Sequence, residues 1–156
     1  MVKYLKFSFI FLFLYSCGYT PIYKVNQKSN FGLDAIIFSG DKKIGRKIEK
    51  NLRKFRNNQT ENIFDANFVS SKIREVVTKD KKGDPSSFKL IIKVKLNLIS
   101  KTNKKTLKKN FIREVTFDSM DNKFELDQYA SNIEKNIIFN ILEDMNIFFK
   151  VIENDL

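Results

Sequence analysis

The stretch FKLIIKVKLNL, residues 88–98, decides the fold of this chain, because apolar and mostly polar side chains alternate along it. Successive side chains of an extended chain point to opposite faces, so residues at every second position share a face. This period of two predicts a β-strand with one buried face and one largely polar face. The side chains predicted to point inward are Phe88, Leu90, Ile92, Val94, Leu96 and Leu98.

Turn residues bound this strand on both sides. A Gly-Asp-Pro turn at 83–85 precedes it, and the polar segment 101–105 follows it. Residues 107–118 predict a further strand, which the short polar turn would pair with the first as an antiparallel hairpin. The side chains predicted to share one side of that strand are Phe111, Val115 and Phe117.

Two upstream segments also predict strands. Residues 33–39 contain the continuous apolar run 35–38, which is typical of a strand in a buried position. Residues 66–79 carry apolar side chains without a clean period of two, so we expect a bulge or break near Ser70 and Ser71.

A helix is predicted over residues 42–57. Asp41 is its expected N-cap, because a carboxylate can accept hydrogen bonds from the free amides of the first turn. The apolar side chains that share one helical face are Ile44, Ile48, Leu52 and Phe55. The other positions are mostly basic, which indicates either a solvated face or a basic surface for an acidic partner or a lipid head group.

A longer helix is predicted over residues 127–150. Its apolar stripe at the helical period consists of Tyr129, Ile133, Ile137, Ile141, Met145 and Phe148. Further apolar side chains widen the stripe beyond what one sheet face can cover; they are Ile138, Phe139, Leu142, Ile147 and Phe149. Either this helix contacts both the sheet and the first helix, or its outer strip lies against a partner protein.

The order strand, helix, three strands, helix predicts an α+β fold. We expect a two-layer sandwich in which a four-stranded mixed sheet carries both helices on one face (β-α-β-β-β-α). The length of the chain fits one hydrophobic core, so residues 33–156 are predicted to form a single domain.

The N-terminus has the three zones of a secretion signal. Lys3 and Lys6 form a positive head, residues 7–15 form an apolar run broken only by a serine, and Ser16 and Cys17 end it. The run is far shorter than the roughly 20 apolar residues of a membrane-spanning helix, so residues 1–16 are predicted to be a cleaved signal peptide. The mature protein should therefore lie outside the cytoplasm.

Cys17 is the predicted site of lipid attachment. The tetrapeptide Leu-Tyr-Ser-Cys at 14–17 resembles a bacterial lipobox, whose thiol receives a diacylglyceryl group before cleavage and whose new amino group is then acylated. The alternative is an ordinary cysteine in a signal peptide or anchor. Cys17 is the only cysteine, so it cannot form an internal disulfide. Residues 17–32 are then a lipidated tether, and Gly18 after the cysteine resembles the signal for sorting to the outer membrane.

Charge and composition restrict the function further. The formal net charge is +11, and loss of Lys3 and Lys6 with the signal would leave a strongly basic mature chain. Such a surface attracts polyanions, which in an envelope are phosphorylated lipids or glycolipids, although part of the lysine excess is also what an AT-rich genome produces. Export removes the chain from nucleic acid, so we expect no nucleic-acid partner.

The sequence predicts no enzyme. It contains no histidine and its one cysteine is assigned to lipid attachment, which excludes Ser-His-Asp and Cys-His catalysis and the usual zinc sites. No pair of carboxylates lies in a recognisable catalytic motif. We therefore assign no catalytic residue, no metal ligand and no cofactor.

Two motifs resemble one family. Residues 17–23, Cys-Gly-Tyr-Thr-Pro-Ile-Tyr, resemble the Cys-Gly-Phe-x-Pro-Leu-Tyr opening of the LPS-assembly lipoproteins of the LptE family, in particular its alphaproteobacterial branch. Residues 126–130, Leu-Asp-Gln-Tyr-Ala, resemble its closing segment. The resemblance implies an outer-membrane lipoprotein, anchored in the membrane by acylated Cys17 and facing the periplasm, that plugs the lumen of the LptD β-barrel and assists lipopolysaccharide assembly. The alternative is another ligand-binding or pilot-type outer-membrane lipoprotein.

The same resemblance places lipopolysaccharide contacts in the loop between the second and third strands. The candidate phosphate partners there are Lys79, Lys81 and Lys82. We expect this turn to lie at one end of the sheet, together with Asp41 and the start of the last helix. The basic turn at 101–105 should lie at the opposite end, with the tether.

Overall fold

The computed structural model describes residues 30–155 and confirms the expected order of elements. The helices and strands are β1 (Phe31–Gly40), α2 (Lys42–Leu52), the short 3-10 helix η2 (Arg53–Phe55), β2 (Asn62–Lys79), β3 (Pro85–Ser100), β4 (Thr106–Asp118) and α3 (Lys123–Asn154). The predicted signal peptide and most of the predicted tether lie outside the described residues.

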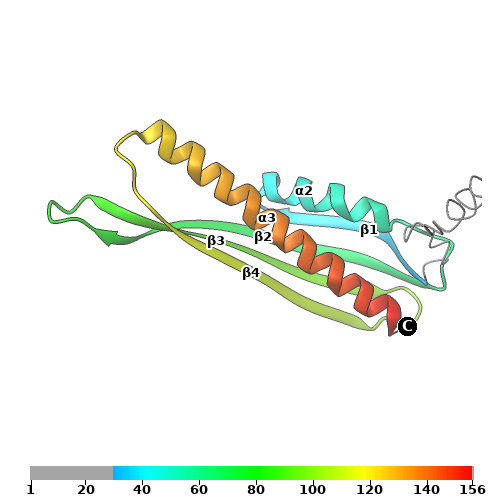
Figure 1. Cartoon of the computed structure of the whole chain (residues 1–156). Helices are drawn as coiled ribbons and strands as arrows, with labels where there is room; N and C mark the ends of the chain where they lie inside the picture. Colours follow the sequence, from blue (N-terminus) through cyan, green and yellow to red (C-terminus); the bar gives the residue numbers. More distant parts are fainter. Residues whose placement is uncertain (1–29, 156) are drawn as a thin grey trace, which may run out of the picture.

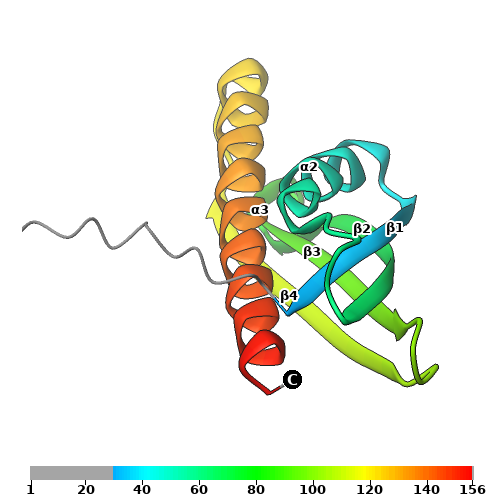
Figure 2. The same cartoon turned by 90° about the vertical axis from the view of Figure 1, so that its right-hand side faces the viewer.

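The four strands form one mixed sheet in the order β1-β2-β3-β4. β1 runs parallel to β2, and the other two pairs are antiparallel. Both helices cover the same face of the sheet, and no helix of residues 30–155 lies on the opposite face (Figures 1 and 2). The structure is therefore the predicted two-layer α+β sandwich.

β3 supplies the centre of the core, as its alternation predicts. Five of its six predicted inward side chains are 3% exposed or less, and Phe88 near the strand's start is partly buried. Val94 pairs with Ser70 on β2 and with Phe111 on β4, so it lies in the middle of three strands. The hairpin of β3 and β4 is also confirmed.

β1 differs from the prediction, because it is an edge strand and not a fully buried one. Ile37 is 61% exposed on the face that carries no helix, whereas Leu33 is fully buried on the other. The register shifts between Leu33 and Ile36, which returns Ile36 and Phe38 to the core side. A continuous apolar run therefore supplies only every second side chain to the core.

The predicted break in β2 near Ser70 and Ser71 is wrong. β2 is continuous over 18 residues, and its register shifts only near its end, between Val76 and Lys79. Ser70 is buried, and its polar groups are satisfied by Asp41. The Ser70 hydroxyl donates to the Asp41 carbonyl at 3.1 Å, and the Ser70 carbonyl accepts from the Asp41 amide at 2.9 Å. Gly40 has a φ of +89° and lies against this carbonyl, where a Cβ atom would clash.

Asp41 caps α2 as predicted. Its Oδ1 accepts from the amides of Lys43 and Ile44 at 2.9 and 3.0 Å. The helix ends at Leu52 and continues only as η2, so it is shorter than expected. The early end allows Phe55 to pack against Phe149 of α3, with ring centroids 4.9 Å apart.

α3 spans 32 residues and begins and ends beyond the predicted bounds. Asn122 caps it by accepting from the amides of Phe124 and Glu125. Contact with α2 and with the rings of Phe31 and Phe55 explains part of the widened stripe, because Ile138 and Phe149 are buried. Other apolar side chains of the helix stay exposed: Tyr129, Phe139, Ile147 and Val151.

Glu134 joins three elements. Its carboxylate, 5% exposed as a residue, lies 3.0 Å from the ammonium groups of Lys43 on α2 and Lys72 on β2. Burial alone would raise the pKa of Glu134, but hydrogen bonds from Lys72 and Lys43, together with their charges, hold that pKa below its usual value of 4.5. The carboxylate therefore stays charged at neutral pH and fixes α3 against both α2 and the sheet.

Candidate functional site

Cys17 lies outside the described residues, so its lipid attachment stays a prediction. The described chain begins at one end of the sheet. Phe31 pairs with Asn62, and the amide of Lys101 in the turn after β3 donates to the Ile63 carbonyl at 2.9 Å. The tether would therefore leave the domain beside this turn, as expected.

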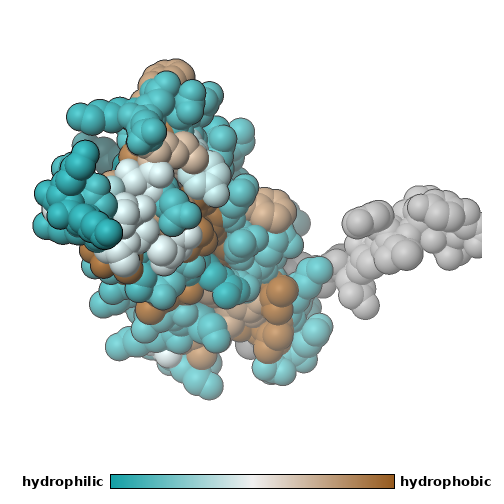
Figure 3. All heavy atoms as spheres, turned by 60° about the vertical axis from the view of Figure 1, so that its left-hand side comes forward, coloured by the Kyte–Doolittle hydropathy of each residue, from teal (hydrophilic) through white to brown (hydrophobic). Residues whose placement is uncertain are grey.

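The first basic tip, which we define as Lys79, Lys81 and Lys82, lies at the far end of the β2–β3 hairpin. All three side chains are exposed, and within residues 30–155 none forms an ion pair. The Asp80 carboxylate instead accepts from the amides of Lys82 and Asp84, at 2.8 and 2.9 Å. The turn thus holds three unpaired cations close together, on a surface that is hydrophilic (Figure 3).

The expected neighbours of this tip need one correction. Asp41 does not lie beside it, because Asp41 bonds to Ser70, nine residues before Lys79 on β2. At about 3.3 Å per residue, that separation is about 30 Å. The start of α3 does lie towards this end, since the amide of Ser119 donates to Ser86 at 2.9 Å. β1 ends and α2 begins well before this tip, so the hairpin projects beyond both (Figure 1).

The second basic tip, which we define as Lys101, Lys104 and Lys105, lies at the opposite end of the sheet, as predicted. Here Lys101 is already engaged, because its ammonium group binds Asp34 and lies 3.8 Å from Asp65. The hydrogen bond to Asp34 raises the pKa of Lys101. The two tips are separate surfaces, and the second offers fewer free cations.

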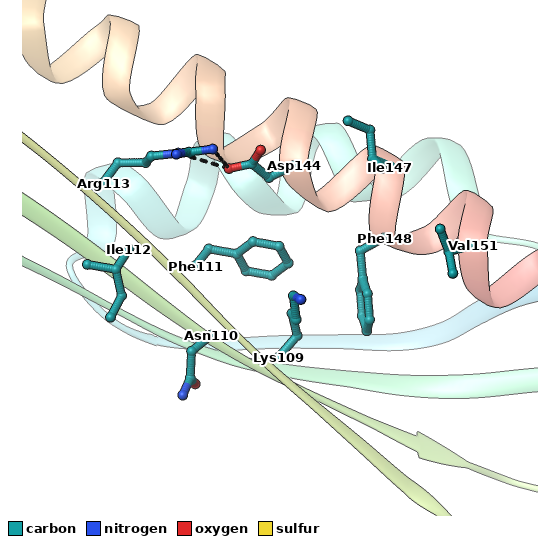
Figure 4. Close-up of a pocket in the computed structure, with 9 residues that line it drawn as sticks. All are labelled: Lys109, Asn110, Phe111, Ile112, Arg113, Asp144, Ile147, Phe148 and Val151. Carbon is teal, nitrogen blue, oxygen red and sulfur yellow. Dashed lines mark hydrogen bonds and ion pairs between the residues drawn. The ribbon is translucent and has the colours of Figure 1, made fainter.

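A groove between β4 and α3 was not foreseen from the sequence (Figure 4). It encloses about 590 Å³, and Phe111 and Phe148 meet edge to face in it with ring centroids 6.1 Å apart. Its arginine is engaged, because the guanidinium of Arg113 donates twice to Asp144, at 3.0 and 2.6 Å. Lys109 lies over the Phe148 ring at 5.7 Å. The alternation of β4 could have indicated the strand's face but not which helix would cover it.

A second groove, the lysine groove, lies between α2 and α3 and encloses about 480 Å³. Its floor is apolar, formed by buried Ile138 and half-buried Leu142, and the ring of Phe139, which also lines it, is 62% exposed. Its rim carries Lys47, Lys50, Lys54 and Lys135. None of the residues within 30–155 that line it carries a carboxylate, so this groove combines an apolar floor with positive charge.

The described residues show neither a metal centre nor a membrane span. Across residues 30–155 no three His, Cys, Asp or Glu side chains converge as metal ligands would. Over the same range no helix combines the length and the apolar composition required to cross a bilayer. The surfaces that the described residues present are exposed cations and two partly apolar grooves.

The fold is similar to that of several bacterial lipoproteins of known structure. The structure is similar to rare lipoprotein B from Shewanella oneidensis, with a TM-score of 0.54 and 14% identity, over 77% of this chain and 99% of that one. It is also similar to lipoprotein B from Nitrosomonas europaea, with a TM-score of 0.51 and 14% identity, over 82% and 92% of the two chains. A minor lipoprotein from Acinetobacter baumannii matches with a TM-score of 0.51 and 7% identity, over 71% and 86%.

At the level of sequence, no protein-family model matches the chain, and no curated protein matches it. At such low identity, the similarity to the three lipoproteins is a similarity of fold. This chain therefore shares the fold of known bacterial lipoproteins.

Proposed function

We propose that this protein is an outer-membrane lipoprotein that plugs and supports the LptD β-barrel and assists lipopolysaccharide assembly without catalysing a reaction. The observation that carries the proposal is a coincidence of two independent features. A tetrapeptide at 14–17 that resembles a lipobox is followed by the family-like opening 17–23, and the domain behind it has a fold similar to that of rare lipoprotein B over 99% of that chain.

The architecture suits such a role. Acylated Cys17 would hold the chain at the membrane, because two or three acyl chains anchor firmly where one does not. The tether, residues 17–32, would separate the domain from the acylated cysteine and so allow it to enter the barrel. The projecting β2–β3 hairpin then presents the first basic tip at the end farthest from the tether, where a phosphorylated glycolipid could reach it.

Stable association with LptD is the first expected result. A C-terminally tagged form of the full chain, purified from detergent-solubilised envelopes, should retain LptD through extensive washing, as detected by mass spectrometry of the eluate. Other abundant outer-membrane barrels of the same envelope serve as the control and should be lost. Intact lipoprotein recovered without LptD, or with a different secretion channel in its place, would contradict the proposal.

Weaker lipopolysaccharide binding is expected when the first basic tip is neutralised. Replacing Lys79, Lys81 and Lys82 by glutamine removes three exposed point charges, each worth roughly 0.5 kcal/mol, so affinity should fall about tenfold. The measurement is a binding titration with lipopolysaccharide at fixed ionic strength. Folding and LptD association should be unchanged, because these side chains touch nothing in the core.

The matched control neutralises the second basic tip. Replacing Lys101, Lys104 and Lys105 by glutamine removes the same formal charge, but Lys101 is already bound to Asp34. This variant should lose less affinity than the first. A larger loss here would mean that lipopolysaccharide contacts the end of the sheet beside the tether.

A further inference from the structure

The segment that forms α2 and η2 carries a large excess of positive charge. Between residues 42 and 56 there are eight lysines and arginines and a single acid, Glu49. Glu49 is paired with Arg53 at 3.0 Å, and Lys43 is paired with Glu134. Within the described part of the chain, the remaining cations form no ion pair: Lys42, Arg46, Lys47, Lys50, Lys54 and Arg56.

The lysine groove adds an apolar element to this charge. Phe139 stands exposed beside the rim lysines, although an aromatic ring in water forfeits the gain of burial. The Oδ1 atom of Asn51, which also lines the groove, is buried and has no hydrogen-bond partner within residues 30–155. Cationic side chains beside an exposed aromatic ring suit a bilayer surface, where hydrated anionic head groups lie above apolar acyl chains.

The predicted tether starts close to the lysine groove, so it bears on which anionic surface the groove can reach. The ring of Phe31, where the described chain begins, lies 6.1 Å from the ring of Phe55 at the end of η2. Residues 17–30 can span at most about 46 Å, at about 3.3 Å per residue. The membrane that holds Cys17 is therefore within reach of the lysine groove, and a tether raises the effective concentration of such a surface.

We infer that the lysine groove docks the domain onto the anionic phospholipid surface in which Cys17 is anchored. Lys47, Lys50, Lys54 and Lys135 lie at the level of the lipid phosphates, and Phe139 enters the interface between head groups and acyl chains. Lysines suit this role because they are mobile point charges, which match laterally mobile phosphates and not one fixed bidentate partner. The inference rests on the proposed lipid anchor and concerns the lipoprotein outside the LptD lumen, because a domain that fills the lumen cannot lie on the bilayer surface.

Lysine protection tests the inference on the acylated full chain. The purified lipoprotein is reconstituted into vesicles of phosphatidylethanolamine and phosphatidylglycerol, and separately into vesicles of phosphatidylcholine. A water-soluble amine reagent then labels exposed lysines, and mass spectrometry gives the rate at each site. The four rim lysines should react about fivefold more slowly on the anionic vesicles, and high salt should abolish the difference because it screens surface charge.

The first basic tip supplies the control within the same molecule. Lys79, Lys81 and Lys82 lie at the opposite end of the sheet from the tether and should react equally on both vesicles. Equal labelling of the rim lysines on the two vesicles would overturn the inference, and so would equal protection of all lysines. Protection that appears only after LptD is added would also overturn it and assign the groove to a protein partner.

A variant separates docking from folding. Lys47→Gln, Lys50→Gln and Phe139→Ser together should return Lys54 and Lys135 to the labelling rate seen on phosphatidylcholine. Lys95→Gln, Lys108→Gln and Ile37→Ser change equivalent exposed side chains on the face without helices and should preserve the protection. Flotation with phosphatidylcholine vesicles tests the anchor separately, because an unacylated chain would not float at all.

Discussion

Replacing Val94 by aspartate is expected to destabilise the domain by about 4 kcal/mol or more. Val94 is fully buried between β2 and β4, so the new carboxylate would be either charged without a partner or protonated at a cost of about 1.4 kcal/mol for each unit by which its pKa rises. Because a domain of this size is stable by only about 5–15 kcal/mol, much of the protein would unfold. Urea denaturation followed by far-ultraviolet circular dichroism measures the loss.

The neighbouring substitution Lys93→Asp is the matched control. Lys93 pairs with Ser71 and Ile112 on the face without helices, where a carboxylate can stay hydrated. We expect a cost below about 1 kcal/mol. Equal losses from the two substitutions would mean that the alternation of β3 does not separate a buried face from an open one.

Replacing Cys17 by serine is expected to abolish lipid attachment almost completely. A serine hydroxyl does not offer the thiolate nucleophile that accepts the diacylglyceryl group, so the precursor should keep its signal peptide. Metabolic labelling with palmitate, read on a gel, should show no lipid on the variant. Washing of membranes at high salt would then show whether the chain remains attached by other means.

Ser16→Ala keeps a small residue before the cysteine and should label with palmitate like the wild type. A Cys17→Ser protein with the same labelling, size and membrane fractionation as the wild type would contradict the lipoprotein assignment.

Local sequence patterns were enough to predict the buried faces of several strands and helices. The alternation over residues 88–98 gave the orientation of β3, and the spacing of Ile44, Ile48 and Leu52 gave the buried face of α2. The cap at Asp41 was also predictable, because the groups that bond there lie within three residues of one another. Such features depend on periods of 2 and about 3.6 residues, which a sequence displays directly.

In the candidate binding surfaces too, only the features formed by residues close in sequence were predictable. The sequence alone indicated that Lys79, Lys81 and Lys82 share a turn, since they are close along the chain. It also displayed the excess apolar surface of the last helix. It did not indicate that Phe139 would join lysines of α2 in one groove, because those residues are about 90 positions apart and meet only when the two helices pack on the same face.

Tertiary structure decided the rest. Whether residues 35–38 lie in a central or an edge strand depends on strand order, and strand order made Ile37 exposed. Glu134 is buried and charged only because Lys43 and Lys72 reach it from two other elements. The distance from Asp41 to the first basic tip depends on how far β2 runs past its parallel partner. These features depend on register between distant segments, and a local period specifies which face a side chain takes but not which segment will cover it.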